Sequence, residues 1–250
     1  MVTMTFYEKK ANTEGLRWEK RMMRRPGMLD RTAKKIQNKI NSVIPEKIHA
    51  GITRTIKEMV RAVLFGAKYT TRKRIIDTTL EVREAIALER IDFYKKTAAT
   101  EGGITGAAGI LGSFADFPLL LGLKMKLLFD IAAIYGYAVK DYRERLYILY
   151  IFQLTFSSRE KSKEVFVKIK NWETEVNHLP EDIHEFNWRS FQQEYRDYID
   201  LAKLAQMIPV IGAAVGAVVN YRLVSKLGET AMNAYRMRYF NYLPELQSAN

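Results

Sequence analysis

The chain has 250 residues, 48% of them hydrophobic and 27% charged, which is ordinary for a globular protein and argues against extensive disorder. It contains no cysteine, which excludes disulfides, thiolate metal sites and a cysteine nucleophile. The formal net charge is +12, and all of the excess lies in the first third: residues 1–75 carry 19 Lys and Arg against 6 Asp and Glu, whereas residues 76–250 carry 21 against 22.

This basic third predicts a surface for an anionic partner, either membrane headgroups or nucleic acid. A solvated basic face that only aids solubility is the alternative. The residues that we single out for an anion-binding surface are Arg21, Arg24, Arg25, Arg31, Lys34, Lys35 and Lys39.

The N-terminus lacks the apolar run of a secretory signal. The longest apolar run near the C-terminus is Met207–Val219, thirteen residues, whereas a spanning helix needs about 20. We therefore expect no conventional transmembrane helix and a cytoplasmic protein, with a peripheral position at the inner face of the cell membrane as an option.

Apolar residues recur at steps of three and four through most of the chain, which is typical of amphipathic helices. Pro45 suits the first turn of one of them. Asp141-Tyr-Arg-Glu144 has the form of a capping box and should open another. The helices that we expect, in chain order, span about 29–40, 45–68, 72–97, 117–138, 141–156, 157–177, 188–206 and, as one long or two shorter helices, 210–241.

No strand, tandem repeat or low-complexity linker is evident from the sequence. It predicts one all-α, bundle-like domain over residues 16–242, with seven to ten helices and two glycine-rich helices in its core. We expect residues 1–15 and 243–250 to be loose.

The glycine-rich block after residue 101 fits neither the phosphate-loop pattern nor the dinucleotide-binding pattern, so we expect no nucleotide cofactor. Its glycines fall on one helical face: Gly102, Gly106, Gly109 and Gly112. Glycine costs a helix interior about 1 kcal/mol relative to alanine, which close approach of a neighbouring helix would offset. A second such face consists of Gly212, Gly216 and Asn220, and we expect the two faces to touch each other or a common neighbour. The same pattern also serves helices in lipid.

Asp116, two residues before Pro118, marks a helix start with Asp as N-cap and Pro in the first turn. It is also the one weak candidate for a catalytic carboxylate. Asp130 lies 14 residues later, roughly 20 Å along a helix axis, which is too far for a carboxylate pair. We expect it to pair with Lys126 at i−4 instead.

Other reactive residue types give little signal. His178 and His184 are six residues apart, off the usual i, i+4 ligand spacing, and with His49 they complete the histidines, so we expect no metal site. Ser113 lacks a nucleophile elbow. The tyrosines cluster with arginines in two stretches; they can stack on bases, sit at lipid headgroups or be core residues with a polar tip, and we favour the last.

Two blocks carry a family resemblance. "GGITGAAGILGSFADFPLLLGLKMKLLFDIAAIYGY" with "ERLYIL", and later "IPVIGAAVGAVVNYRLV", resemble the EcsC family of bacterial proteins from about Ile44 to Phe240. The specific part is the glycine block with Asp116, Pro118 and Tyr135-Gly136-Tyr137. An Asp is frequent after that last triplet in such proteins, whereas this chain has Ala138. The resemblance implies a helical protein from an ABC-transporter gene neighbourhood linked to secretion, with no accepted catalytic residues to carry over.

Four functional hypotheses follow. The first is a non-enzymatic, peripheral membrane or lipid-interacting protein that is accessory to membrane transport or secretion machinery. The second is a soluble adaptor that docks an acidic protein partner, and the third is an enzyme with an unrecognised site around Asp116. The fourth, nucleic-acid binding, would show an affinity that falls steeply with salt, and no nucleic-acid motif supports it.

Overall fold

The computed structural model describes residues 4–24, 46–65, 73–106, 116–199 and 213–248. The helices in these ranges are α1 (Phe6–Met23), α3 (Glu46–Phe65), α4 (Leu80–Gly106), α6 (Phe117–Ile134), α7 (Tyr142–Phe156), α8 (Arg159–Lys170), α9 (Trp172–Val176), the 3-10 turn η1 (Ile183–Glu185), α10 (Trp188–Tyr198) and α12 (Ala213–Ser248). The described part contains no strand. The predicted all-α class is therefore confirmed, with about nine helices packed as one domain.

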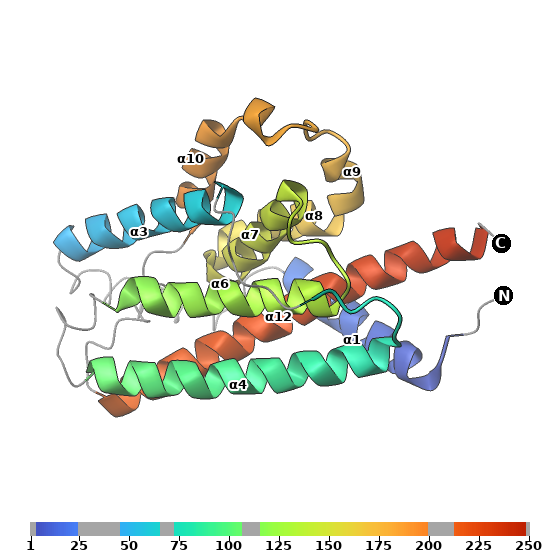
Figure 1. Ribbon diagram of the computed structural model, residues 1–250, viewed down its shortest axis with the longest axis horizontal. Coiled ribbons are helices and arrows are strands. Elements are labelled where there is room, and N and C mark those ends of the chain that lie inside the picture. Colours follow the sequence, from blue (N-terminus) through green and yellow to red (C-terminus); the bar gives the residue numbers. More distant parts are fainter. Residues whose placement is uncertain (1–3, 25–45, 66–72, 107–115, 200–212, 249–250) are drawn as a thin grey trace.

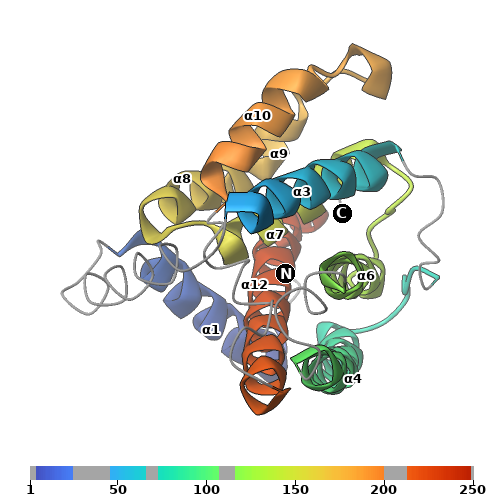
Figure 2. The same cartoon turned by 90° about the vertical axis from the view of Figure 1, so that its left-hand side faces the viewer.

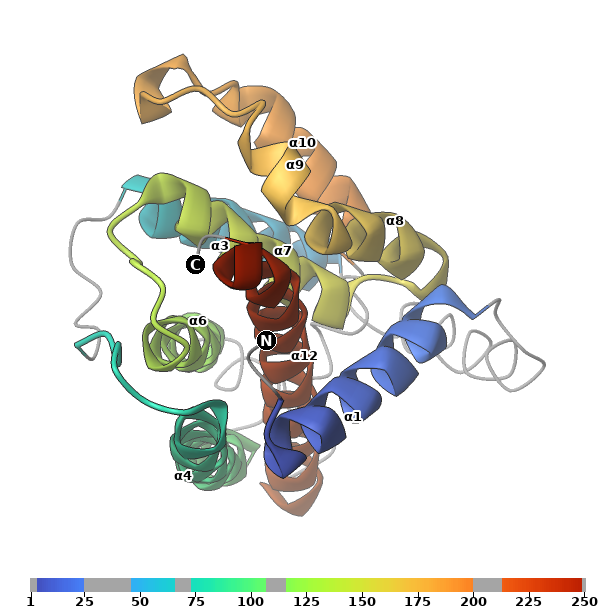
Figure 3. The ribbon, with the colours of Figure 1, turned by 90° about the vertical axis from the view of Figure 1, so that its right-hand side faces the viewer.

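The long helix α12 lies at the centre of the molecule. When the molecule is viewed along its long axis, α4 and α6 lie on one side of α12 and α1 lies on the other, while α7 packs beside α12 (Figures 2 and 3). The helices α3, α8, α9 and α10 form an outer group around α7, and the chain from α9 to α10 makes an arc at the far edge (Figure 1).

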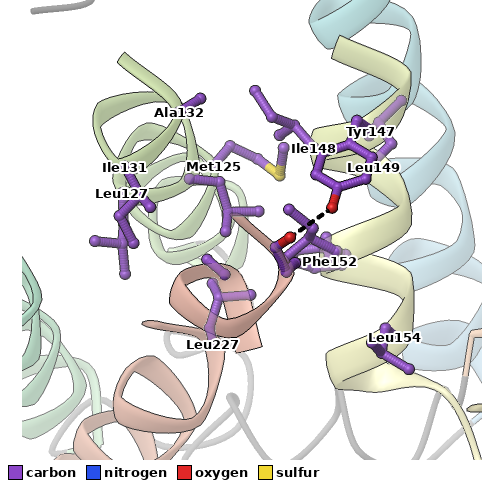
Figure 4. Close-up of a cluster of buried hydrophobic side chains, with 14 of the residues drawn as sticks. Met125, Leu127, Ile131, Ala132, Tyr147, Ile148, Leu149, Phe152, Leu154 and Leu227 are labelled. Carbon is purple, nitrogen blue, oxygen red and sulfur yellow. Dashed lines mark hydrogen bonds between the residues drawn. The ribbon is translucent and has the colours of Figure 1, made fainter. Parts of the chain in front are cut away.

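The core lies where α6, α7 and α12 meet. Side chains of α6 and α7 point toward one another there, among them Met125 and Phe152, both fully buried, and Leu227 of α12 joins them (Figure 4). The α6 stretch is buried around most of its circumference, which explains why its sequence is apolar with little helical periodicity.

Most expected helices are confirmed, with shifted ends. The helix expected over 72–97 begins at Leu80 instead, because residues 73–79 are not helical: the Ile75 amide donates to the carbonyl of Ala133, 3.0 Å away, at the end of α6. This helix then runs through the first glycines to Gly106. The polar helix expected over 157–177 is divided at Asn171 into α8 and α9. The helix expected over 29–40 lies outside the described residues.

Helix α1 has no counterpart among the expected helices, because we expected residues 1–15 to be loose. A capping box starts it: the Glu8 amide donates to Thr5 Oγ1, and the Thr5 amide donates to the Glu8 carboxylate. Ala11 and Trp18 of α1 are buried against the body, and Trp18 meets Phe166 of α8 edge-on at 5.5 Å. At the other end of the chain, α12 continues through most of the tail that we expected to be loose.

Helices α4 and α12 pack along each other. A close approach of the two helices lies at Gly228 of α12. A Cβ atom there would lie 2.6 Å from Cγ1 and 2.9 Å from Cγ2 of Ile91 on α4. Glycine at 228 therefore lets the two backbones approach.

Gly228→Ala should lower the free energy of unfolding by about 1–3 kcal/mol, because the new methyl group clashes with the branched Ile91 side chain. The clash outweighs the gain in helix propensity of about 1 kcal/mol. Denaturant unfolding measures this. In an Ile91→Ala background the same substitution should become neutral or stabilising.

The matched control is Gly122→Ala on α6, where an added Cβ meets nothing within 4 Å. This variant should be as stable as the parent or more so. Equal effects of the two substitutions would contradict the close approach at Gly228.

Candidate functional site

The stretch Tyr135-Gly136-Tyr137 forms the turn that ends α6. Gly136 has a φ of +94°, in the region that favours glycine. An added Cβ would also lie 2.9 Å from an Arg83 guanidinium nitrogen and 3.2 Å from the Ile75 carbonyl. Arg83 donates to the Tyr135 carbonyl and so holds the turn against α4. The turn aims the two flanking tyrosines into the protein.

Tyr135 reaches the first of two buried ion pairs. Glu84 of α4 is fully buried and accepts two hydrogen bonds from the Arg236 guanidinium of α12, one of 2.6 Å. The Tyr135 hydroxyl donates to the same carboxylate at 3.0 Å, and the hydroxyl of Tyr7 on α1 donates at 2.8 Å. Three helices and the turn that ends α6 thus meet at one carboxylate.

The second pair lies two residues further along α12. Arg238 donates to Glu144 of α7 at 2.7 Å and to Glu173 of α9 at 3.0 Å. Tyr235 donates to Glu144 at 2.6 Å. The Arg238 guanidinium also lies 3.9 Å from the ring centre of Tyr137, a cation–π contact.

Stacked tyrosines join the two pairs. The rings of Tyr135 and Tyr235 stack at 5.4 Å, and Tyr147 meets Tyr235 edge-on at the same distance. Burial raises the pKa of Tyr135 and Tyr235 well above the usual range, and the adjacent carboxylates add to this effect. These hydroxyls therefore stay protonated and donate hydrogen bonds to the carboxylates. The ion pairs and tyrosines thus form a buried structural network.

This arrangement changes one expectation and confirms another. Asp141 caps α7 by accepting from the Arg143 amide at 2.9 Å, but Glu144 does not close the expected capping box, because its carboxylate is taken by Tyr235 and Arg238. The core interpretation of the tyrosines is confirmed for those that are buried with bonded hydroxyls: Tyr94, Tyr135, Tyr142, Tyr147, Tyr195 and Tyr235.

A buried lysine lies between α6 and α12. Lys124 is fully buried; its ammonium group donates to Asn220 Oδ1 at 3.1 Å and to the Leu120 carbonyl at 3.4 Å. No carboxylate pairs with it in the described part of the chain, and burial lowers its pKa to about 7. Asn220 was singled out from the sequence, whereas Lys124 was missed. The one sequence signal for Lys124 is that it is a cation within an otherwise apolar stretch.

The acidic candidates have different surroundings. Asp116 stands at the N-cap position of α6 with Pro118 in the first turn, as expected, but its side chain makes no capping hydrogen bond. The Lys126–Asp130 pair is present at 3.8 Å, yet Asp130 is held more closely by Arg90 and by the hydroxyl of Tyr94, both at 2.9 Å. Nothing in the described structure tests Asp116 as a catalytic residue.

Helix α1 has two chemically distinct faces. Its inner face is fastened by polar contacts: besides Tyr7, Glu8 accepts from Tyr239 at 2.6 Å and Glu19 from Lys170 at 2.7 Å. The outward face carries five exposed cations to which no described residue offers a carboxylate: Lys9, Lys10, Arg17, Lys20 and Arg24. Elsewhere on the molecule some exposed cations are paired, such as Lys96, whereas others, such as Arg54 and Lys140, also have no carboxylate partner among the described residues.

Large apolar side chains are exposed among these cations. Phe6 is 86% exposed, Leu16 50% and Met23 42%. Of the cations singled out from the sequence, Arg21 and Arg24 lie at the end of α1, and Arg21 pairs with Glu229 at 3.0 Å. The others lie outside the described residues: Arg25, Arg31, Lys34, Lys35 and Lys39. The Thr5-x-x-Glu8 capping box is the signal that could have revealed α1.

Comparison with known proteins shows to which family the chain belongs. A model of the EcsC protein family matches residues 9–240. The chain belongs to the EcsC protein family. Protein EcsC of Bacillus subtilis (strain 168) is 46% identical over 228 residues, which cover 90% of this chain and 93% of that protein. The uncharacterized protein YdbA of the same strain is 29% identical over 235 residues, 88% of this chain and 85% of its own length. No solved structure matches the chain.

The resemblance to the EcsC family is thereby confirmed, and the family motifs can be placed. Gly102 and Gly106 end α4, and Gly216 lies in the first turn of α12. The remaining glycines, Gly109, Gly112 and Gly212, lie outside the described residues, so contact between the two glycine faces stays a prediction. No three described His, Cys, Asp or Glu side chains gather in a way that could hold a metal ion.

Glu84→Gln should lower the free energy of unfolding by about 3 kcal/mol, because it removes the buried counter-charge of Arg236 and leaves only the more exposed Glu14 beside it. Chemical denaturation measures the loss. Glu81→Gln, an exposed position on the same helix, is the control and should change stability by less than about 0.5 kcal/mol. Similar losses in the two variants would show that the buried pair does not hold α4 to α12.

Lys124→Met should change how stability depends on pH. Between pH 7 and 10.5 the unfolded chain binds a proton at Lys124 that the folded chain lacks, so the parent's stability should rise with pH across this window. The variant loses this rise, and its stability relative to the parent should be greatest below pH 7, with a change across the window on the order of 3 kcal/mol.

Losing the hydrogen bond to Asn220 lowers the free energy of unfolding by the same amount at every pH. The quantity to measure is therefore the slope of the free energy of unfolding against pH. Lys140→Met, at an exposed position, should leave the parent's pH dependence unchanged. Parallel curves for Lys124→Met and the parent would contradict a neutral buried amine.

Proposed function

We propose that this EcsC-family protein is a non-enzymatic, peripheral protein of an anionic membrane surface. The outward face of α1 carries the proposal, because it combines exposed apolar side chains with cations that have no carboxylate partner among the described residues. Such a helix suits the boundary between headgroups and acyl chains. None of the described helices is long and apolar enough to cross a membrane.

Electrostatics and shallow insertion would act together at this face. Each basic residue near an anionic leaflet contributes about 1 kcal/mol. Phe6 and Leu16 can add apolar contact without unfolding, since neither belongs to the buried core. The family resemblance of the sequence supports a role accessory to membrane transport or secretion machinery at that surface.

Binding to vesicles tests the proposal. The protein should co-sediment with vesicles that contain phosphatidylglycerol, not with phosphatidylcholine alone, and the affinity should fall as salt rises. The variant Lys9→Gln, Lys10→Gln, Arg17→Gln and Lys20→Gln should bind at least tenfold more weakly. Glutamine keeps helix propensity, and circular dichroism should confirm that the fold is retained.

The matched control removes four exposed cations elsewhere: Arg54→Gln, Arg61→Gln, Lys140→Gln and Lys163→Gln. This control has the same net charge as the α1 variant, so its affinity should stay within about threefold of the parent. Equal losses in both variants would show that net charge alone drives binding. No binding to either vesicle, with an acidic protein retained after lipid extraction, would favour the adaptor hypothesis.

A further inference from the structure

The exposed side chains of the first three turns of α1 surround a hollow. Figure 3 shows the position of this helix at the edge of the domain. The volume of the hollow is about 350 Å³. The residues that line it are Phe6, Lys9, Lys10, Thr13, Glu14 and Arg17. Lys20 and Arg24 follow on the same face but lie outside the hollow.

The groups around this hollow leave three cations available. Glu14 is engaged by Arg236 of α12 at 3.2 Å. The Thr13 hydroxyl donates to the Lys9 carbonyl at 2.8 Å, so it has no proton left to offer a ligand. No carboxylate pairs with Lys9, Lys10 or Arg17 in the described part of the chain. The available donors are therefore two ammonium groups and one guanidinium.

This donor set fits a phosphate group. A guanidinium binds phosphate oxygens through two parallel hydrogen bonds, and ammonium groups add charge without fixed geometry. A phosphate monoester carries about −1.5 to −2 charge at neutral pH, whereas a diester carries about −1, so three cations around one hollow match the monoester better.

Phe6 identifies the source of that phosphate. Its side chain is 86% exposed at the edge of the hollow, where a free anion would make no use of it. An acyl chain attached to the phosphate would cover it and gain free energy from the buried apolar area.

We infer that this hollow binds the phosphate of an anionic lipid headgroup and prefers a monoester to a diester. The inference rests on the proposed function, since it makes one part of the membrane-facing helix selective. Lys20 and Arg24 then supply attraction to any anionic surface, whereas Lys9, Lys10 and Arg17 distinguish headgroups.

The test uses vesicles with phosphatidic acid or phosphatidylglycerol, adjusted to the same measured zeta potential. The full-length protein should bind the phosphatidic acid vesicles at least fivefold more tightly. Lys9→Gln with Lys10→Gln should abolish this preference and leave weaker binding to both. Lys20→Gln with Arg24→Gln removes the same charge from the same face and should weaken both while keeping the preference.

Each other outcome has a defined meaning. Equal binding of the parent to both vesicles would overturn the headgroup inference and leave the proposed function standing, whereas no binding to either would overturn both. Inorganic phosphate or glycerol 3-phosphate should compete only weakly, because neither covers Phe6. Full competition at equal phosphate concentration, with unchanged vesicle binding by Phe6→Gln, would assign the hollow to a soluble anion.

Discussion

Burial of two arginine charges on α12 constrains the rest of the structure. Arg236 and Arg238 enter the protein interior two residues apart and turn to opposite partners, Glu84 on α4 and Glu144 on α7. A buried ion pair adds little net stability compared with apolar residues of the same size, but losing one partner is costly. Neighbouring helices must therefore bring the carboxylates to the arginines, and this requirement fixes how α12 lies against α4 and α7.

The tyrosines complete this arrangement. A carboxylate has more acceptor sites than one guanidinium fills, and the hydroxyls of Tyr135, Tyr7 and Tyr235 occupy several of the remaining ones. Tyr135 can take part only because the chain reverses at Gly136 directly after α6. A motif that has no catalytic explanation in the sequence thus acquires a structural one: it ends a helix and places a hydrogen-bond donor beside a buried charge.

Local patterns let the sequence predict much of the fold. Helical spacing located α3, the Asp116 and Pro118 start signal located α6, and the Asp141 cap located α7. These signals, like the Lys126–Asp130 pair, depend on residues only a few positions apart. The buried clusters were missed because Glu84 and Arg236 are 152 positions apart, and each alone has the character of an exposed helical residue. Likewise, glycine spacing predicted helix contact, but the approach at Gly228 depends on the position of Ile91 across the interface.

The outward face of α1 was also beyond the sequence prediction, although the excess of basic residues pointed to the right third of the chain. Charge counts do not show which cations are paired, and pairing separates Lys9 and Lys10 from Lys168 or Lys170. Only the three-dimensional structure shows which positive charges remain available to a partner.

The polar contacts on the inner face of α1 fix the orientation of this helix relative to the rest of the domain. Because α1 is anchored at several points along its inner face, a flat anionic surface that it contacts would hold the whole domain in one orientation. The arc between α9 and α10 lies far from α1 (Figures 2 and 3), and residues 177–187, which form it, contain three acidic side chains and no Lys or Arg. Repulsion from the same surface would direct this arc outward, so a single helix would decide which side of the protein faces away from such a surface.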